Sequence, residues 1–583
     1  MDQKLKIAFV CLLASVQIAG CGSRAAKVKD VRSIKILGAG KDLQRGGDAR
    51  AAIRSLEESC GPDYAPGRAA LRLMSHEEYD QTISALLYTK EIASKLAVFE
   101  ASPKGPSGFA SDTANVSLTP LTVAKYWSAA TTLADSVIAG KEAQDSAFRQ
   151  IASCAVAKND VELSCLESII SDLGLRAWRR PLSSGGADSE KARLLRLMQQ
   201  APSFDQALRS LIAALLISPN FLFISVPSDS ADSDLPLGLD EVTALNDYQI
   251  ASRLSYFIWG TMPDQELFSL AAAGQLKDEA KLTQQVERML KDDRASYLVR
   301  AIVKDWIGID ELEHLATPSV SEELKRAMLE ETWRFVADLL IQDKSITNLV
   351  SANYTFASGA LADHYGLPFS GTDRAQFQIL DLTNAPRRGV LGQAAFLLAT
   401  AGSTTETRPV KRGKDLALKW LCQEIPPPPP GVPPLDTSKL SANATPREML
   451  AVHTNNPSCS GCHERLDPLG LGFESFDATG KWRTNYAHLG NAPVDSSGKL
   501  ASGTEFKDTR ELLDRLSESP DVQTCLARRM IDFAVKRSAS SRDDRCVAGV
   551  LGASKWGAQG KFSDLMKAVV LTRQFRQQSG DTP

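Results

Sequence analysis

The residues of this sequence with the most specific chemistry are Cys459, Cys462 and His463, which belong to one Cys-Ser-Gly-Cys-His motif. Two cysteines separated by two residues, with a histidine directly after the second, are typical of a c-type haem attachment site. In such a site each thiol is bonded to one vinyl group of the porphyrin, and the imidazole is the proximal ligand of the iron. The motif therefore predicts one covalently bound haem c with His463 on the iron.

Two other interpretations of the cysteine pair stay open. A Cys-x-x-Cys pair can also form a redox-active disulfide or half of a zinc site. The sequence contains no second Cys-x-x-Cys pair, although His453 could join His463 in a Cys2His2 site of unusual spacing. If Cys459 and Cys462 form a disulfide, the chain would be a structural or binding protein without haem.

The distal side of the iron and the haem propionates also need partners. Met530 is the first candidate for the sixth ligand, because it lies downstream of the motif on a predicted helix, the usual direction for a distal methionine. The weaker candidates are Met449, His453 and His488. Arg408 and Arg412 are candidate partners of the propionates, because a guanidinium pairs bidentately with a carboxylate.

The coordination of the iron separates two classes of function. A closed, six-coordinate iron favours single-electron transfer to a redox partner protein, whereas an open sixth position would bind oxygen or peroxide in an enzyme. The chain could also support an extracytoplasmic oxidation, with the haem receiving the electrons. Glu474 and Asp477 follow the motif, and we expect both to be surface carboxylates. The sequence has no His-Glu-x-x-His motif, phosphate loop or dinucleotide fingerprint that would indicate another chemistry.

Helices must position the motif, because apolar residues recur at helical spacing through most of the chain. Ser75 and Glu78 form a predicted capping box at the start of one helix. The prolines from Pro426 to Pro430 predict an extended polyproline segment, and the alternation at residues 494–506 predicts a small β-hairpin. The predicted fold class is mainly α, with several consecutive helical domains and a cytochrome c-like haem segment.

The chain of 583 residues is too long for one hydrophobic core, so we expect several domains. Its formal net charge of -3 and the lack of a basic tract give no reason to expect nucleic-acid binding. The predicted divisions are a signal peptide at 1–20, a flexible tether at 21–66, helical domains at 67–140 and 141–226, a linker at 227–239, a third helical domain at 240–370, the haem-attachment domain at 371–490, and a hairpin with helices at 491–583.

The amino terminus predicts export and a lipid anchor. Lys4 and Lys6 precede a largely apolar run at residues 7–18, which is too short to cross a bilayer and is typical of a signal peptide. Small residues then precede Cys21, as in the lipobox of bacterial lipoproteins. We therefore expect cleavage before Cys21 and a lipid on its sulfur. Such a protein would be held at the envelope, at an outer membrane facing the periplasm or the cell surface.

Six further cysteines remain once the signal peptide, the lipid site and the haem motif are set aside. An even number of cysteines in an exported protein favours disulfides. The preferred pairs are Cys154 with Cys165 and Cys525 with Cys546, because each pair lies within one group of helical segments. This leaves Cys60 with Cys422, and buried free thiols are the alternative.

Several stretches together resemble a bacterial exported family, common in planctomycetes and myxobacteria, that is made of domains of unknown function 1587, 1595, 1592, 1588 and 1585 with a cytochrome c-like motif. The stretches that carry the resemblance are 72–79, 176–181, 253–264, 354–366 and 459–483. The resemblance implies these domain divisions and a haem-like site, but the family has no settled activity and implies no substrate. Relatives often carry an additional cytochrome c domain at the amino end, and this chain has no second Cys-x-x-Cys-His motif. That difference argues against a multi-haem relay.

Overall fold

The computed structural model describes residues 49–67, 71–100, 102–115, 118–155, 162–224, 242–401, 406–426, 440–454, 457–555 and 557–579. The predicted signal peptide, the predicted lipid-modified Cys21 and the predicted linker at 227–239 lie outside the described residues. The same is true of the predicted polyproline segment beyond Pro426. Among the residues that are described, no helix combines the length and apolar character needed to span a bilayer.

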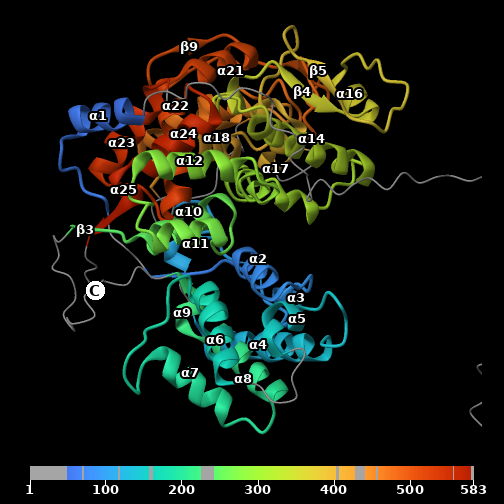
Figure 1. The fold of residues 1–583 in the computed structure, drawn as a ribbon. Helices are drawn as coiled ribbons and strands as arrows, with labels where there is room; N and C mark the ends of the chain where they lie inside the picture. Colours follow the sequence, from blue (N-terminus) through green and yellow to red (C-terminus); the bar gives the residue numbers. More distant parts are fainter. Residues whose placement is uncertain are drawn as a thin grey trace, which may run out of the picture.

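The described chain is mainly helical, as predicted, and its helices surround two hydrophobic cores. Figure 1 shows the smaller N-terminal body, in blue to teal, below the main body, which is green to red apart from the blue helix α1. The helices of the N-terminal body are α2 (His76–Leu87), α3 (Ala93–Leu96), α4 (Pro120–Ala139), α5 (Ala147–Ile151), α6 (Leu163–Trp178), α7 (Glu190–Gln199), α8 (Phe204–Ile217) and α9 (Pro219–Leu222). One core therefore joins residues of the first and second predicted domains, while the predicted boundaries themselves stay predictions.

The main body contains the remaining helices and one π-helical segment, Ala301–Ile307. Its α-helices are α1 (Ala49–Cys60), α10 (Asp247–Ile258), α11 (Gln265–Ala272), α12 (Glu279–Leu290), α13 (Ser296–Arg300), α14 (Glu322–Ile341), α15 (Asn348–Ser351), α16 (Gly359–Tyr365), α17 (Ala394–Ala401), α18 (Pro409–Trp420), α19 (Pro446–Thr454), α20 (Pro457–Leu471), α21 (Thr509–Glu518), α22 (Pro520–Val535), α23 (Arg542–Ala553), α24 (Phe562–Leu571) and α25 (Arg573–Arg576). Leu56 of α1 precedes the N-terminal body in the sequence and Phe109 lies between its helices α3 and α4, yet both belong to the core of the main body.

Local sequence signals explain where several helices begin. The Ser75 hydroxyl accepts a hydrogen bond from the Glu78 backbone N–H, and the Glu78 carboxylate accepts one from the Ser75 backbone N–H, which confirms the predicted capping box of α2. Asn246 and Gln249 form an equivalent box at α10. Each box satisfies backbone donors that the first helical turn leaves without a partner.

The strands form short antiparallel pairs rather than one sheet. The pairs are β1 (Arg72–Leu73) with β2 (Phe223–Ile224), β3 (Val242–Ala244) with β10 (Gln577–Ser579), β4 (Tyr354–Ala357) with β5 (Gln378–Asp381), β6 (Asn485–Tyr486) with β7 (Ala492–Pro493), and β8 (Gly498–Lys499) with β9 (Glu505–Phe506). The last pair confirms the predicted hairpin near 494–506. The pair of β3 with β10 joins the segment that precedes α10 to the C-terminal end of the main body, in register Gln577 to Ala244.

Disulfides join distant parts of the chain. The bond between Cys154 and Cys165 confirms one predicted pair. The predicted pair of Cys525 with Cys546 is wrong, because Cys525 is bonded to Cys422 and Cys546 to Cys60. The cause is tertiary packing: α1 lies against α23, and α18 lies against α22, so cysteines far apart in the sequence meet across helix contacts.

Arg179, which directly follows α6, lies between the two bodies and not at the surface. Arg179 is buried and donates hydrogen bonds to the backbone oxygens of Asn220, Phe221 and Phe223, which end α9 and begin β2. Its guanidinium also lies 5.7 Å from the ring centroid of Tyr256. Arg179 therefore ties the N-terminal body to α10 of the main body.

Candidate functional site

The Cys-Ser-Gly-Cys-His motif lies on α20, which packs against α18 and α19. Two glycines permit a close contact between α18 and α20. A Cβ atom at Gly413 would lie 2.1 Å from the backbone oxygen of Leu466, and one at Gly470 would lie 1.9 Å from that of Pro409. Since real Cβ atoms do not approach so closely, glycine at both positions lets the backbones of the two helices touch.

The two cysteines of the motif are three residues apart on one helix and therefore share a face. Both are half-buried, and neither takes part in a disulfide. The other six described cysteines are all bonded in pairs. The geometry thus separates structural cysteines from two thiols that can react with another group.

A buried carboxylate holds the histidine of the motif. Nδ1 of His463 lies 3.0 and 3.2 Å from the two carboxylate oxygens of Asp467, one turn further along α20. Asp467 is only 4% exposed and also accepts a hydrogen bond of 3.2 Å from the hydroxyl of Thr454 at the end of α19. A carboxylate on one ring nitrogen of a histidine fixes the tautomer and ring orientation in which the other nitrogen binds a metal.

These groups have the chemistry that a c-type haem requires. Two thiols on one helical face could form the thioether bonds, and an imidazole oriented by a carboxylate could ligate the iron. Within the described ranges, no group of three or more His, Cys, Asp or Glu side chains is arranged to hold a metal ion by itself.

The two arginines predicted to bind propionates differ in exposure. Arg408 is exposed and lies at the N-cap of α18. Arg412 has no exposed surface, and its guanidinium donates to the backbone oxygens of Phe473 and Leu397 at 3.1 and 3.3 Å. Burial lowers the pKa of Arg412 to about 10. Arg412 is therefore a structural group inside the body, and Arg408 is the arginine of the two that can reach a ligand at the surface.

The prediction that Glu474 is a surface carboxylate is wrong. Its side chain is fully buried, where it accepts hydrogen bonds from Arg483 at 2.8 Å, Thr407 at 2.9 Å and Tyr486 at 3.2 Å. The pattern of charged residues around it gave no sign of this network, because its members come from three separate segments. Asp477 caps a tight turn by accepting the backbone N–H groups of Thr479 and Lys481.

The candidate distal ligands also occupy different surroundings. Met530 of α22 is fully buried in the main core. Met449 is half-buried on α19, the helix that packs against the motif helix. His488 is exposed, and the side chain of His453 lies outside what the structure describes. Met449 is thus the candidate methionine whose helix is in direct contact with α20.

A separate cavity of about 260 Å³ lies where the two bodies meet, and its wall includes His76, Ser111, Tyr297 and Asp305. Asp305 belongs to the π-helical segment, a geometry that is frequent at functional sites. Burial raises the pKa of Asp305 to about 6, and burial lowers the pKa of His76. A carboxyl group and a neutral imidazole of this kind are suited to proton transfer. Sequence spacing gave no sign of this cavity.

Taken together, fold and motif define a mainly helical protein with a Cys-x-x-Cys-His motif on α20. Five family models match the chain in succession, and each is described as a protein of unknown function: DUF1587 at 72–139, DUF1595 at 165–225, DUF1592 at 245–367, DUF1588 at 387–486 and DUF1585 at 502–575. The chain belongs to the family made of these domains. The model at 387–486 is named PSCyt3 and spans the whole motif. Searches of curated proteins and of solved structures gave no match.

Proposed function

We propose that this protein is an envelope lipoprotein that carries one covalent haem c and transfers single electrons. Cys459 and Cys462 would form the thioether bonds, and His463 would be the proximal ligand. The observation that carries the proposal is the motif on α20, with two thiols outside any disulfide and an imidazole held by Asp467. The match to PSCyt3 over the same residues adds support through its name.

The residues around the motif have defined roles in this proposal. A haem c supplies an iron that changes its charge by one unit without breaking bonds to the protein. Asp467 orients the imidazole and increases its basicity, which favours the oxidised iron. The contact of α18 with α20 holds the motif helix against the core. Arg408 is the proposed partner of a propionate, since its guanidinium is exposed beside this contact.

The proposed anchor is a lipid on Cys21, which would keep the protein at an outer membrane facing the periplasm or the cell surface. The support is the short apolar run and the lipobox-like residues before Cys21. The six cysteines found in disulfides also fit an oxidising compartment. We expect Cys21→Ser to move the protein from the membrane fraction to the soluble fraction, and an unchanged distribution would exclude the anchor.

The deciding experiment is a haem stain after denaturing electrophoresis of protein matured with a c-type haem ligation system. We expect a stained band for the natural sequence and none for Cys459→Ala with Cys462→Ala. Gly461→Ala is the matched control, because it changes the same motif without touching an attachment group and its Cβ would meet nothing within 4 Å. An exported, folded and colourless natural protein would end the proposal.

A disulfide between Cys459 and Cys462 is the alternative, in which the chain is a structural or binding lipoprotein. Alkylation of the exported protein followed by mass spectrometry separates the two cases. The haem proposal expects a mass gain of one porphyrin at the motif peptide. A motif peptide that is two hydrogens lighter, with no porphyrin, would establish the alternative.

The sixth ligand decides between electron transfer and an enzyme that binds oxygen or peroxide. We expect the reduced protein not to bind carbon monoxide, as a six-coordinate iron requires. Met449→Leu and Met530→Leu then test the two methionines through the Soret band. Because Met530 is a core residue, its variant should be checked for folding by circular dichroism before the spectrum is interpreted. Binding of carbon monoxide by the natural protein would favour the enzyme.

A further inference from the structure

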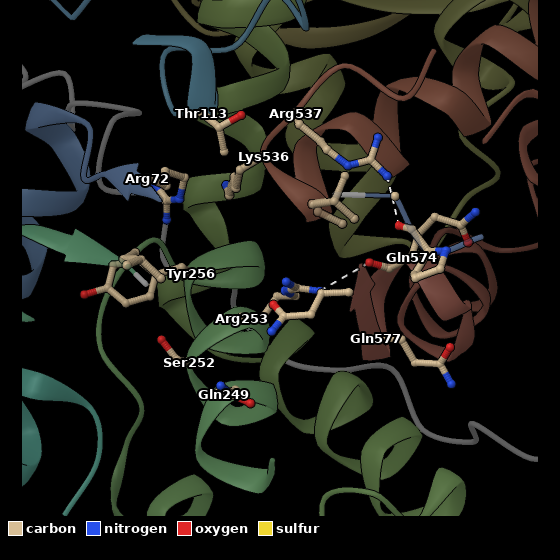
Figure 2. A pocket seen from close by; sticks show the side chains of 16 residues that line it. Arg72, Thr113, Gln249, Ser252, Arg253, Tyr256, Lys536, Arg537, Gln574 and Gln577 are labelled. Atoms are coloured by element: carbon tan, nitrogen blue, oxygen red, sulfur yellow. Dashed lines mark hydrogen bonds between the residues drawn. The ribbon is translucent and has the colours of Figure 1, made fainter. Parts of the chain in front are cut away.

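A cavity of about 60 Å³ lies at the junction of the two bodies, away from the haem motif in the sequence. Figure 2 shows Arg253 in the middle of the labelled groups, with Arg72, Tyr256 and Lys536 on one side and Arg537, Gln574 and Gln577 on the other. The wall therefore combines β1, α10, the end of α22 and β10. None of the residues singled out for haem binding belongs to it.

Arg253 is the exceptional charge in this wall. Its guanidinium donates to the backbone oxygens of Phe575 at 2.7 Å and Gln574 at 3.2 Å, and no carboxylate of the described chain forms an ion pair with it. Burial, together with the positive charges of Arg537 and Arg72, lowers the pKa of Arg253 to about 10. Arg253 is half-buried, and a partly desolvated cation without a counter-ion is costly, so a bound anion would relieve an unfavourable interaction.

Within the part of the chain that the structure describes, the other cations of the wall form ion pairs with two carboxylates. Glu78 accepts from Arg72 and lies 3.6 Å from Nζ of Lys536. Arg537 forms a bidentate pair with Asp544, at 2.9 and 3.1 Å. Three guanidinium groups and the amine of Lys536 thus line the cavity, against two paired carboxylates beside it. This excess of positive charge is the electrostatic signature of a site for anions.

Close packing fixes the position of the arginine opposite Arg253. A Cβ atom at Gly67 would lie 1.9 Å from a terminal nitrogen of Arg537, and Gly67 has a φ of +78°. The same guanidinium donates to the backbone oxygen of Pro66 at 3.0 Å. Glycine at this position therefore leaves the space in which the guanidinium lies against the cavity.

Two glutamines add hydrogen-bonding capacity that the protein itself does not use. Gln574 and Gln578 are 2% and 3% exposed, and the side-chain carbonyl oxygen of each has no hydrogen-bond partner. A carbonyl oxygen only accepts hydrogen bonds, so each of these buried oxygens needs a donor such as an ordered water, which can in turn donate to a bound oxyanion. Both residues line the cavity.

We propose that this cavity binds a small oxyanion, with Arg253 as its principal ligand and Arg537 and Arg72 as the flanking charges. A guanidinium binds the oxygens of phosphate, sulfate or carboxylate with two parallel hydrogen bonds. The volume equals that of about two water molecules, which suits one oxyanion group rather than a whole sugar or nucleotide. The ligand is a free inorganic ion or the anionic group of a larger molecule whose remainder lies outside.

The test is isothermal titration of the full-length protein with sodium sulfate, whose charge does not change between pH 5 and 9. We expect saturable binding with one site per chain and a loss of affinity of at least about tenfold in Arg253→Gln, the size expected for one charge-assisted bidentate contact. Arg209→Gln is the control, because Arg209 forms an exposed pair with Asp135 in the N-terminal body. Absence of binding, or equal binding by both variants, would overturn the proposal.

Arg253 also supports backbone oxygens, so its replacement could unfold the protein. A second pair of variants avoids this ambiguity. Ser252 lines the cavity beside Arg253, and Ser252→Glu and Ser252→Gln introduce side chains of the same size that differ in charge. We expect the glutamate variant to lose sulfate binding and the glutamine variant to keep more of it. Equal affinities in the two variants would contradict the site.

The source of the oxyanion is tested by changing the probe. Inorganic phosphate, a monosaccharide phosphate and a uronic acid are titrated under the same conditions as sulfate. Tighter binding of either sugar derivative than of the inorganic ions assigns the cavity to the anionic group of a larger ligand. Equal or weaker binding of the sugar derivatives assigns it to a free ion. If none of the four probes binds, there is no oxyanion site.

Discussion

The haem motif and the oxyanion cavity differ in how the chain builds them. The motif groups, Cys459, Cys462 and His463, are contiguous on one helix, and their positioning carboxylate follows one turn later. The cavity is assembled from residues 66, 67, 72, 113, 224, 249, 252, 253, 256, 534–537, 574, 577 and 578, which come together only in the folded chain. A site of the first kind is visible as spacing in a sequence, whereas one of the second kind is visible only as charge and burial in space.

The largest effect is expected from removing the disulfide between Cys60 and Cys546, which should weaken the cavity and leave the haem motif unchanged. Cys60→Ala with Cys546→Ala opens a sequence separation of 486 and removes a link beside the Pro66–Gly67 wall of the cavity. Chain entropy alone gives about 6 kcal/mol for such a closure and about 3 kcal/mol for the closure between Cys154 and Cys165, and measured losses are commonly smaller. Urea unfolding measures the stability of each variant. Titration calorimetry measures its sulfate affinity, and a haem stain shows whether haem is attached.

We expect this double variant to lose sulfate affinity and to keep its haem stain. The matched control, Cys154→Ala with Cys165→Ala, should lose less stability and leave sulfate affinity unchanged. If the two double variants lowered sulfate affinity and haem staining equally, the cavity and the haem motif would not be independent.

A smaller effect is expected from breaking the helix contact that supports the motif. Gly413→Ala places a Cβ atom against the backbone oxygen of Leu466, so α18 and α20 must separate. Overpacking of this kind costs about 1–3 kcal/mol of unfolding free energy. Gly549→Ala is the control, since its Cβ would meet nothing within 4 Å on α23, and a stabilisation of about 0.5–1 kcal/mol is expected. Urea denaturation of both variants measures the difference, and a neutral Gly413→Ala would refute the close contact.

Proton binding should alter the affinity of the cavity for sulfate. Burial lowers the pKa of Lys536 to about 7, so its ammonium group becomes charged as the pH falls through this value. The groups that face it are Glu78, Arg72, Tyr297, Asp305 and the ring of Phe533. Sulfate affinity should therefore rise severalfold from pH 8 to pH 6, as measured by titration calorimetry.

Two variants identify the group responsible for this pH dependence. Lys536→Gln should make sulfate affinity nearly constant over the same range. Asp305 also takes up a proton near pH 6, which would act in the same direction, so Asp305→Asn should keep the dependence that comes from Lys536. An affinity that falls on acidification would contradict the assignment.

The smallest expected effect concerns the tuning of the motif by Asp467. Asp467→Asn removes the carboxylate charge from His463 and makes the imidazole a weaker donor to the iron, so the reduction potential should rise. Redox titration followed in the visible spectrum measures the change. Thr454→Val removes only the second contact of Asp467 and should leave the potential close to that of the natural protein. A lower potential in Asp467→Asn would contradict the proposed role.

The sequence predicted features that depend on neighbouring residues. The capping box of Ser75 and Glu78, the mainly helical fold and the hairpin near 494–506 follow from patterns within a few residues, and the structure confirms them. The bond between Cys154 and Cys165 also spans only 11 residues. Local propensity and short loops leave few alternatives at such positions.

Features that depend on tertiary packing could not be predicted in this way. The partners of Cys60 and Cys525 are set by which helices touch, and the sequence does not encode that as spacing. Arg412 and Glu474 have charges typical of a surface, but both are buried where hydrogen bonds from distant segments satisfy them. Arg253 likewise has no sequence pattern that distinguishes it from other arginines, because its neighbours in the folded protein come from distant segments.

The bond between Cys60 and Cys546 also determines how the protein would respond to a protease. Any single cut of the backbone between these two cysteines leaves fragments that remain joined by the sulfur bridge. Cleaved molecules would migrate as one species on a non-reducing gel and as two after reduction. Loss of a peptide bond in an exposed segment would therefore not release either half of the protein from the other.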